Sequence, residues 1–150
     1  MGEPYGEKYR IRRPDHESTM KMLELLCRTE DLLAMGEDYS AALRELNDLF
    51  TIPAMIEEIS GYYDFQDEED FIIAHTVPDY HKFGNLPDEE ILWLISEIIR
   101  NMDDEYLVVF YCSVVDFNTS GKPGRCNEMI FYENIREPSA VLERLRLHDA

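Results

Sequence analysis

The stretch LPDEEILWLISEIIR, residues Leu86–Arg100, carries the clearest amphipathic helix pattern in the chain. Pro87 presets the backbone φ of a first helical turn, and the three acids that follow it meet the positive end of the helix dipole. Apolar side chains then recur at helical spacing, at Ile91, Leu94, Ile95, Ile98 and Met102. The pattern predicts a helix over residues 87–101, with the stripe from Ile91 to Ile98 buried.

The next segment, EYLVVFYCSVVDF over residues 105–117, is ambiguous when it is considered alone. Its β-branched and aromatic side chains favour a strand. Two features oppose a strand: the acidic run 103–105 is a good helix entrance, and apolar and polar residues do not strictly alternate. The residues by themselves leave both structures open.

Helical patterns also cover most of the remaining chain. They predict helices at residues 15–35, 38–50, 54–59 and 137–147, and a helical turn or two after the acidic run 67–70. Residues 1–13 show no periodicity and hold several Gly and Pro residues, which predicts a flexible arm. A length of 150 residues is typical of one domain. We therefore expect an all-α helical bundle, formed by a single helical domain over residues 14–150.

The composition, 45% hydrophobic and 31% charged, excludes disordered and collagen-like chains. No apolar run approaches the roughly 18 residues that cross a bilayer, and the N-terminus has no apolar signal segment. Three cysteines, Cys27, Cys112 and Cys126, form no framework spacing, which favours reduced thiols over disulfides. These features predict a cytoplasmic protein without membrane contact.

The net charge of −18 is unevenly distributed. Residues 57–105, the acidic belt, contain fifteen acids against only Lys82 and Arg100. Such a surface repels phosphate backbones and anionic membranes, so direct nucleic-acid binding is not expected. It attracts basic proteins and accelerates their association. The alternative interpretation is that the acids only keep the protein soluble.

Sequence motifs of catalysis are missing. The chain has no GxGxxG, GxxxxGK[ST] or GxSxG motif, and neither HExxH nor CxxC. His75 and His81 are six residues apart, a spacing that does not place them on one helical face, so we expect surface or loop histidines. We therefore predict no enzymatic activity, no catalytic residue, no metal site and no cofactor.

Four matches resemble the colicin and pyocin nuclease immunity proteins, small four-helix proteins that bind and block a bacterial DNase toxin. Leu86–Arg100 is similar to that family's first helix, and DDEYLVVFYCSVVDFNT (Asp103–Thr119) falls where its second helix would lie. NEMIFY (Asn127–Tyr132) resembles the Ser-Asp-Leu-Ile-Tyr-Tyr motif on the very short third helix. PSAV (Pro138–Val141) resembles the entry to the fourth.

The resemblance covers residues 86–147 and has departures. The first aromatic residue of the motif is Phe131 rather than Tyr, Glu133 replaces a Pro, and the loop before the motif is slightly longer. The second helix is less acidic than a toxin-facing helix of that family. Residues 14–85 have no counterpart and would form an added helical layer.

The resemblance implies that residues 103–118 are a helix packed antiparallel against 87–101. It also implies a binding mode beside the nuclease active site, in which acids steer a basic partner and an aromatic pair anchors it. The residues carried over are Asp104, Glu105 and Asp116 for steering and ion pairs, and Glu128, Phe131 and Tyr132 for the anchor. An anchor needs exposure, so at least Tyr132 should present part of its ring to solvent.

Two other functions remain open at this stage. The carboxylates of residues 57–105 could imitate phosphates, as in a DNA-mimic protein that occupies a nucleic-acid enzyme without an aromatic anchor. A small enzyme on a helical scaffold is the third possibility, and it would need a concave pocket with converging polar groups.

Overall fold

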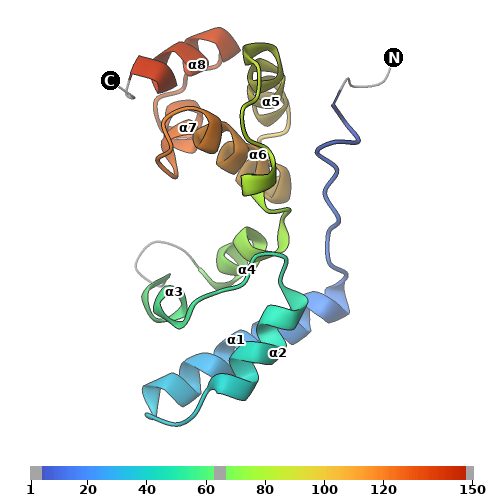
Figure 1. The fold of residues 1–150 in the computed structure, drawn as a ribbon, viewed down its shortest axis with the longest axis vertical. Helices are drawn as coiled ribbons and strands as arrows, with labels where there is room; N and C mark the ends of the chain where they lie inside the picture. Colours follow the sequence, from blue (N-terminus) through green and yellow to red (C-terminus); the bar gives the residue numbers. More distant parts are fainter. Residues whose placement is uncertain (1–4, 63–66, 148–150) are drawn as a thin grey trace. The chain divides into compact units, whose positions relative to one another are not determined.

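The computed structural model describes residues 5–62 and 67–147 of the chain. Every regular element in these two ranges is a helix, which confirms the predicted all-α fold (Figure 1). The chain forms two compact units: an N-terminal unit, Arg12–Pro78, and a C-terminal unit, Met1–Ile11 with Asp79–Ala150. The expected single domain over 14–150 is thus divided after Pro78, seven residues before the boundary that the family resemblance implies.

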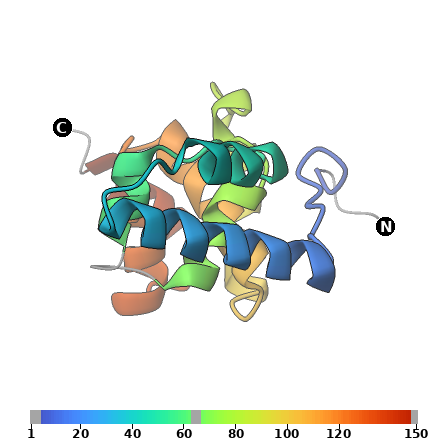
Figure 2. The same cartoon turned by 90° about the horizontal axis from the view of Figure 1, so that it is seen from below.

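The N-terminal unit contains α1 (His16–Ala34), α2 (Ser40–Leu49), α3 (Ile56–Gly61) and α4 (Glu68–Thr76). α1 begins where the Asp15 carboxylate accepts a hydrogen bond from the Ser18 N–H at 2.8 Å, and it ends before Gly36, whose φ of 69° stops the helix. α1 and α2 lie side by side (Figures 1 and 2). Their facing side chains form a core with α3 and α4: Met22, Leu25, Leu26, Leu46, Phe50, Ala54, Ile59, Tyr62, Phe71 and Ile72.

His75 corrects a sequence expectation, because it is buried in α4 with 6% of its surface exposed. Its ring stacks on Phe50 with 5.1 Å between the ring centroids. Its Nδ1 lies 2.7 Å from the carbonyl oxygen of Ile52, which can only accept, so Nδ1 carries a proton. His75 therefore belongs to the core of the N-terminal unit. His81, in contrast, is exposed as expected.

The C-terminal unit contains η2 (Tyr80–Lys82), α5 (Asp88–Arg100), α6 (Glu105–Asn118), α7 (Arg125–Asn127), η3 (Glu128–Tyr132) and α8 (Pro138–Leu147). α5 lies in contact with both α6 and α8 (Figure 1). The stripe predicted on α5 is confirmed, since none of its four side chains has exposed surface: Ile91, Leu94, Ile95 and Ile98.

The ambiguous segment is the helix α6. Asp104 caps it by accepting from the Leu107 N–H at 3.3 Å. Phe110 and Val114 are completely buried, whereas Leu107 is half-buried. Helix propensities of β-branched and aromatic residues are less favourable than that of Ala by up to about 0.7 kcal/mol each, while burying such a side chain contributes about 1.5–3 kcal/mol. Burial against the rest of the unit therefore outweighs the local preference for a strand.

The N-terminal segment, predicted to be a flexible arm, is packed against the rest of the C-terminal unit at Tyr9. Only 1% of the Tyr9 surface is exposed, and its hydroxyl donates to the buried carboxylate of Glu90, which also pairs with Lys8 Nζ at 2.6 Å. Four aromatic rings lie around it, those of Phe83, Trp93, Phe110 and Tyr111. Residues 5–11 are thus part of the C-terminal unit, and residues 1–4 of the expected arm lie outside the described residues.

Candidate functional site

Residues 125–132, named here the exposed turn, form the short helices α7 and η3 of the C-terminal unit. η3 is a single π-helical turn, in which the Glu133 N–H donates to the Glu128 carbonyl at 3.0 Å. Single π turns are rare and occur frequently at functional sites. The family resemblance predicts a very short helix at this place.

The exposed turn has a buried side and an open side. Met129 and Ile130 have no exposed surface, so they fix the turn to the core. Phe131 is half-buried, whereas Tyr132 has 78% of its surface exposed. The expected exposure of Tyr132 is confirmed. A tyrosine this open presents both its ring and its hydroxyl to a partner.

Glu128 begins the π turn and is exposed. Its Oε2 lies 3.0 Å from Nη1 of Arg125, three residues earlier on the same turn. An exposed pair of this kind is worth about 0–1 kcal/mol, so a partner's cation can replace Arg125 at little cost. Glu128 and Tyr132 are therefore available together on one turn.

Residues 134–136 hold the end of the exposed turn in place. Asn134 adopts φ 57°, the left-handed conformation that reverses the chain after a helix. The Ile135 N–H donates to the Met129 carbonyl at 3.0 Å, and the Arg136 guanidinium donates to the carbonyl of Ile130. Sequence reasoning missed both Asn134 and Arg136. The available signal was an Asn two residues after the helix end, with a basic residue two positions further along.

Asp116 corrects the sequence expectation, because it is 4% exposed and cannot supply a surface ion pair. Its carboxylate accepts from the N–H of Gly124 at 3.0 Å and from the N–H of Cys126 at 2.8 Å. Burial raises the pKa of Asp116 to about 6, against the lowering effects of these two N–H groups and of Arg125. Asp116 is thus a support of the exposed turn.

Asp104 and Glu105 lie at the opposite end of α6 from Asp116. Eleven residues of helix separate Glu105 from Asp116, which corresponds to about 17 Å along the axis. Asp104 is engaged as the N-cap of α6, whereas Glu105 is exposed. The structure therefore joins Asp116, Glu128, Phe131 and Tyr132 through one loop and turn, and places the other two acids apart from them.

Two polar pairs of the N-terminal unit are Cys27 with Glu68 and Tyr62 with Glu30. In the N-terminal unit, the Cys27 thiol donates to Glu68 Oε2 at 3.6 Å. Burial, followed by the nearby charge of Glu68, raises the pKa of Cys27, the opposite of what a nucleophilic thiolate requires. Burial also raises the pKa of Glu30, which accepts from the hydroxyl of Tyr62.

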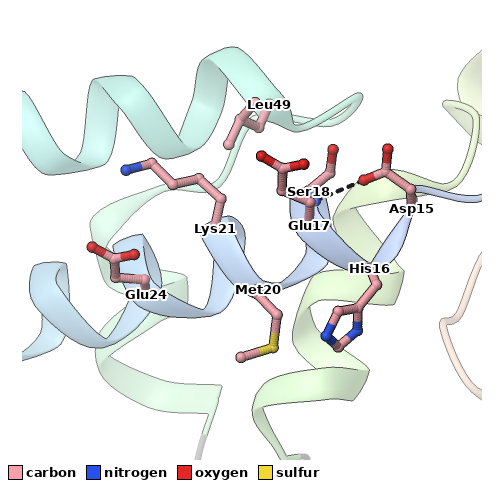
Figure 3. Close-up of a pocket in the computed structure, with 8 residues that line it drawn as sticks. All are labelled: Asp15, His16, Glu17, Ser18, Met20, Lys21, Glu24 and Leu49. Atoms are coloured by element: carbon pink, nitrogen blue, oxygen red, sulfur yellow. Dashed lines mark hydrogen bonds between the residues drawn. The ribbon is translucent and has the colours of Figure 1, made fainter.

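A hollow of about 600 Å³ lies beside α1 in the N-terminal unit (Figure 3). Figure 3 shows His16 and Ser18 pointing to different sides of α1, so they cannot form a pair of base and nucleophile. Asp15 is already engaged as the N-cap of α1. The hollow is lined by Asp15, His16, Glu17, Ser18, Met20, Lys21, Glu24 and Leu49.

The structure describes residues 5–62 and 67–147. No group of three or more His, Cys, Asp or Glu side chains in these ranges is arranged to hold a metal ion. None of the helices described is long and apolar enough to span a membrane.

The exposed turn is the feature of the C-terminal unit in which an open aromatic side chain and an open acid share one short segment. No family model, no curated protein and no solved structure matches the chain.

Proposed function

We propose that this protein is a non-catalytic inhibitor of the immunity type, which binds and neutralises a basic bacterial toxin such as a nuclease in the cytoplasm. The observation that carries the proposal is the 78% exposure of Tyr132 on a π turn that also presents Glu128. An aromatic side chain with few rotamers loses little entropy when it is covered, and such residues are frequent binding hot spots.

The charge of the chain agrees with a basic partner. A net charge of −18 steers a cationic protein toward the surface and raises the association rate. Covering Tyr132 then contributes about 1.5–3 kcal/mol through burial of its ring. Glu128 supplies a carboxylate beside the ring, and Glu105 adds an exposed acid on α6. Asp116 contributes no ion pair in this proposal, because it is buried.

The DNA-mimic alternative depends on the acidic belt, residues 57–105. Two of its acids, Glu90 and Glu97, are buried and paired with Lys8 and Arg100, so they cannot imitate surface phosphates. The belt also includes residues of both compact units rather than one element. We therefore do not propose the DNA-mimic function, and the binding test below has a result that would favour it.

The test is titration calorimetry of the protein with a panel of purified colicin-type DNase domains. We expect at least one domain to bind, and Tyr132→Ala to weaken that binding by about 10- to 100-fold while the melting temperature stays unchanged. The matched control is Leu147→Ala, which removes another apolar side chain of the same unit with 64% exposure and should leave affinity unchanged.

Three results would contradict the proposal. If no domain of the panel binds, the immunity-type function is wrong. Equal affinity of Tyr132→Ala and wild type would remove the anchor. Loss of binding only after several acid-to-amide changes within residues 57–105 would favour the DNA mimic.

A further inference from the structure

We propose that Asp116 is the positioning residue of the exposed turn: its buried carboxylate holds the loop before residues 125–132 and thereby orients Glu128 and Tyr132. The geometric part of this inference stands on contacts within the C-terminal unit. Its consequence for partner binding rests on the function proposed above.

Asp116 accepts hydrogen bonds from three residues of the loop between α6 and α7 and from Cys126 in α7. Its carboxylate accepts from the N–H groups of Gly124 and Cys126, at 3.0 and 2.8 Å. Its backbone carbonyl accepts from Thr119 at 3.2 Å and from Gly121 at 2.7 Å. One residue thus satisfies four backbone N–H groups, three of them in the loop 119–124 and one in α7.

The backbone connects this loop directly to the exposed turn. The Glu128 N–H donates to the Gly124 carbonyl at 3.0 Å, and the Glu133 N–H donates to the Glu128 carbonyl at 3.0 Å. From Cys126 to Tyr132 there are only six residues, about 9 Å at a helical rise. A shift of Gly124 or Cys126 therefore moves Glu128 and Tyr132 with it.

The surroundings of Asp116 make this support dependent on its ionisation. Arg125 is the charged group that acts on it from α7, and the Cys126 thiol, itself in contact with Cys112, is the other titratable neighbour on that element. Because burial raises the pKa of Asp116 to about 6, the group is ionised at neutral pH and protonated near pH 5. A raised pKa means that the closed loop binds this proton more tightly than an opened, solvated loop does, so protonation stabilises the closed loop.

The test is hydrogen–deuterium exchange of the free protein, followed on peptides that cover residues 119–133. After correction for intrinsic exchange, we expect wild-type protection of this segment to rise roughly fivefold or more between about pH 7.5 and about pH 5, because opening the loop returns the Asp116 carboxyl towards its lower ordinary pKa. In Asp116→Asn, which keeps one acceptor oxygen and has no proton to gain, protection should not change with pH and should be below the wild-type value at about pH 5. Peptides from α1, in the N-terminal unit, are the internal control and should behave alike in both proteins.

The wild-type comparison needs no variant and no partner, so it remains decisive if Asp116→Asn folds poorly. Equal protection of residues 119–133 at both pH values in wild type would overturn the inference, and so would an identical pH response in the variant. A purely structural role of Asp116 would lower protection in Asp116→Asn but would leave the wild-type protection of residues 119–133 independent of pH.

The binding measurement separates this inference from the proposed function. If a DNase domain binds wild type, Asp116→Asn should bind it roughly fivefold more weakly at neutral pH. The loss is expected because an exposed turn that residue 116 no longer orients must be ordered when the partner binds. Equal affinity of the two proteins would overturn the positioning role and leave the inhibitor function standing. Absence of any binding, with pH-dependent protection intact, would remove the inhibitor function and leave the positioning role of Asp116 in the free protein.

Discussion

The buried carboxylate of Asp116 couples the stability of the C-terminal unit to pH. Burial raises its pKa from the ordinary 3.8 to about 6, so the folded protein holds this proton more tightly than the unfolded chain does. Its contribution to stability is complete below about pH 3.8 and is lost as the pH rises through about 6. At neutral pH the ionised group therefore costs about 2–3 kcal/mol.

The variant Asp116→Asn tests the direction in which the stability of the unit changes with pH. The variant has no proton to gain, so its free energy of unfolding relative to wild type should fall by about 2–3 kcal/mol between about pH 7.5 and about pH 4. Urea unfolding monitored by Trp93 fluorescence is the measurement, because this residue is the only Trp of the chain and lies on α5 of the same unit. A difference between the two proteins that is constant with pH would contradict the raised pKa.

At the scale of the element, packing against neighbouring side chains stabilises α6, whereas its own residues have a local preference for a strand. Six of its residues are buried, including the polar Asp116: Phe110, Tyr111, Cys112, Val114, Val115 and Asp116. The ring of Phe110 lies edge-on to that of Phe83, with centroids 5.6 Å apart, and near that of Tyr9. The helix therefore depends on its neighbours along much of its length.

Phe110→Ala should lower the free energy of unfolding by about 3–5 kcal/mol, because it removes a large side chain from a site without solvent access. The same fluorescence-monitored unfolding measures the loss. Glu105→Gln, an exposed change on the same helix, is the control and should stay within about 0.5 kcal/mol of wild type. A small effect of Phe110→Ala would mean that α6 packs more loosely than its burial indicates.

At the scale of the whole molecule, the C-terminal unit is completed by the other end of the chain. Tyr9 lies 81 residues before Glu90, and it is held by the hydrogen bond to that carboxylate and by four aromatic contacts. The hydroxyl and the ring therefore make separable contributions.

Tyr9→Phe should destabilise the C-terminal unit by about 1–3 kcal/mol, because Glu90 then loses one of its two partners in a buried place. Tyr9→Ala should cost about 3–5 kcal/mol, since the ring is lost as well. Trp93, whose ring stacks on Tyr9 at 6.0 Å, reports both changes by fluorescence. If both variants unfold like wild type, residues 5–11 contribute nothing to the unit.

The net charge belongs to the molecule as a whole and governs the encounter with a partner. For a DNase domain that binds, the association rate should fall by about tenfold or more between low and high salt, while the dissociation rate changes little. Tyr132→Ala should show the opposite pattern, with faster dissociation and an unchanged association rate. Surface plasmon resonance over a salt series measures both, and a salt-independent association rate would mean that steering is absent.

Local patterns in the sequence were sufficient to predict four of the helices. The expected helices 15–35, 38–50, 87–101 and 137–147 agree with α1, α2, α5 and α8 within two residues at each end. The α5 stripe and the open position of Tyr132 were also predicted correctly. These features follow from periodicity, capping and a short motif, all of which operate within a few turns of helix.

Only the tertiary structure decided which polar and aromatic residues are buried. Asp116 was expected at the surface, His75 at the surface or in a loop, and Tyr9 in a flexible arm, and each is buried by groups from other segments. The strand preference of residues 105–117 was overridden in the same way, and it was the family resemblance rather than the residues that predicted a helix there. Burial depends on contacts between positions far apart in the chain, which periodicity within one segment does not record.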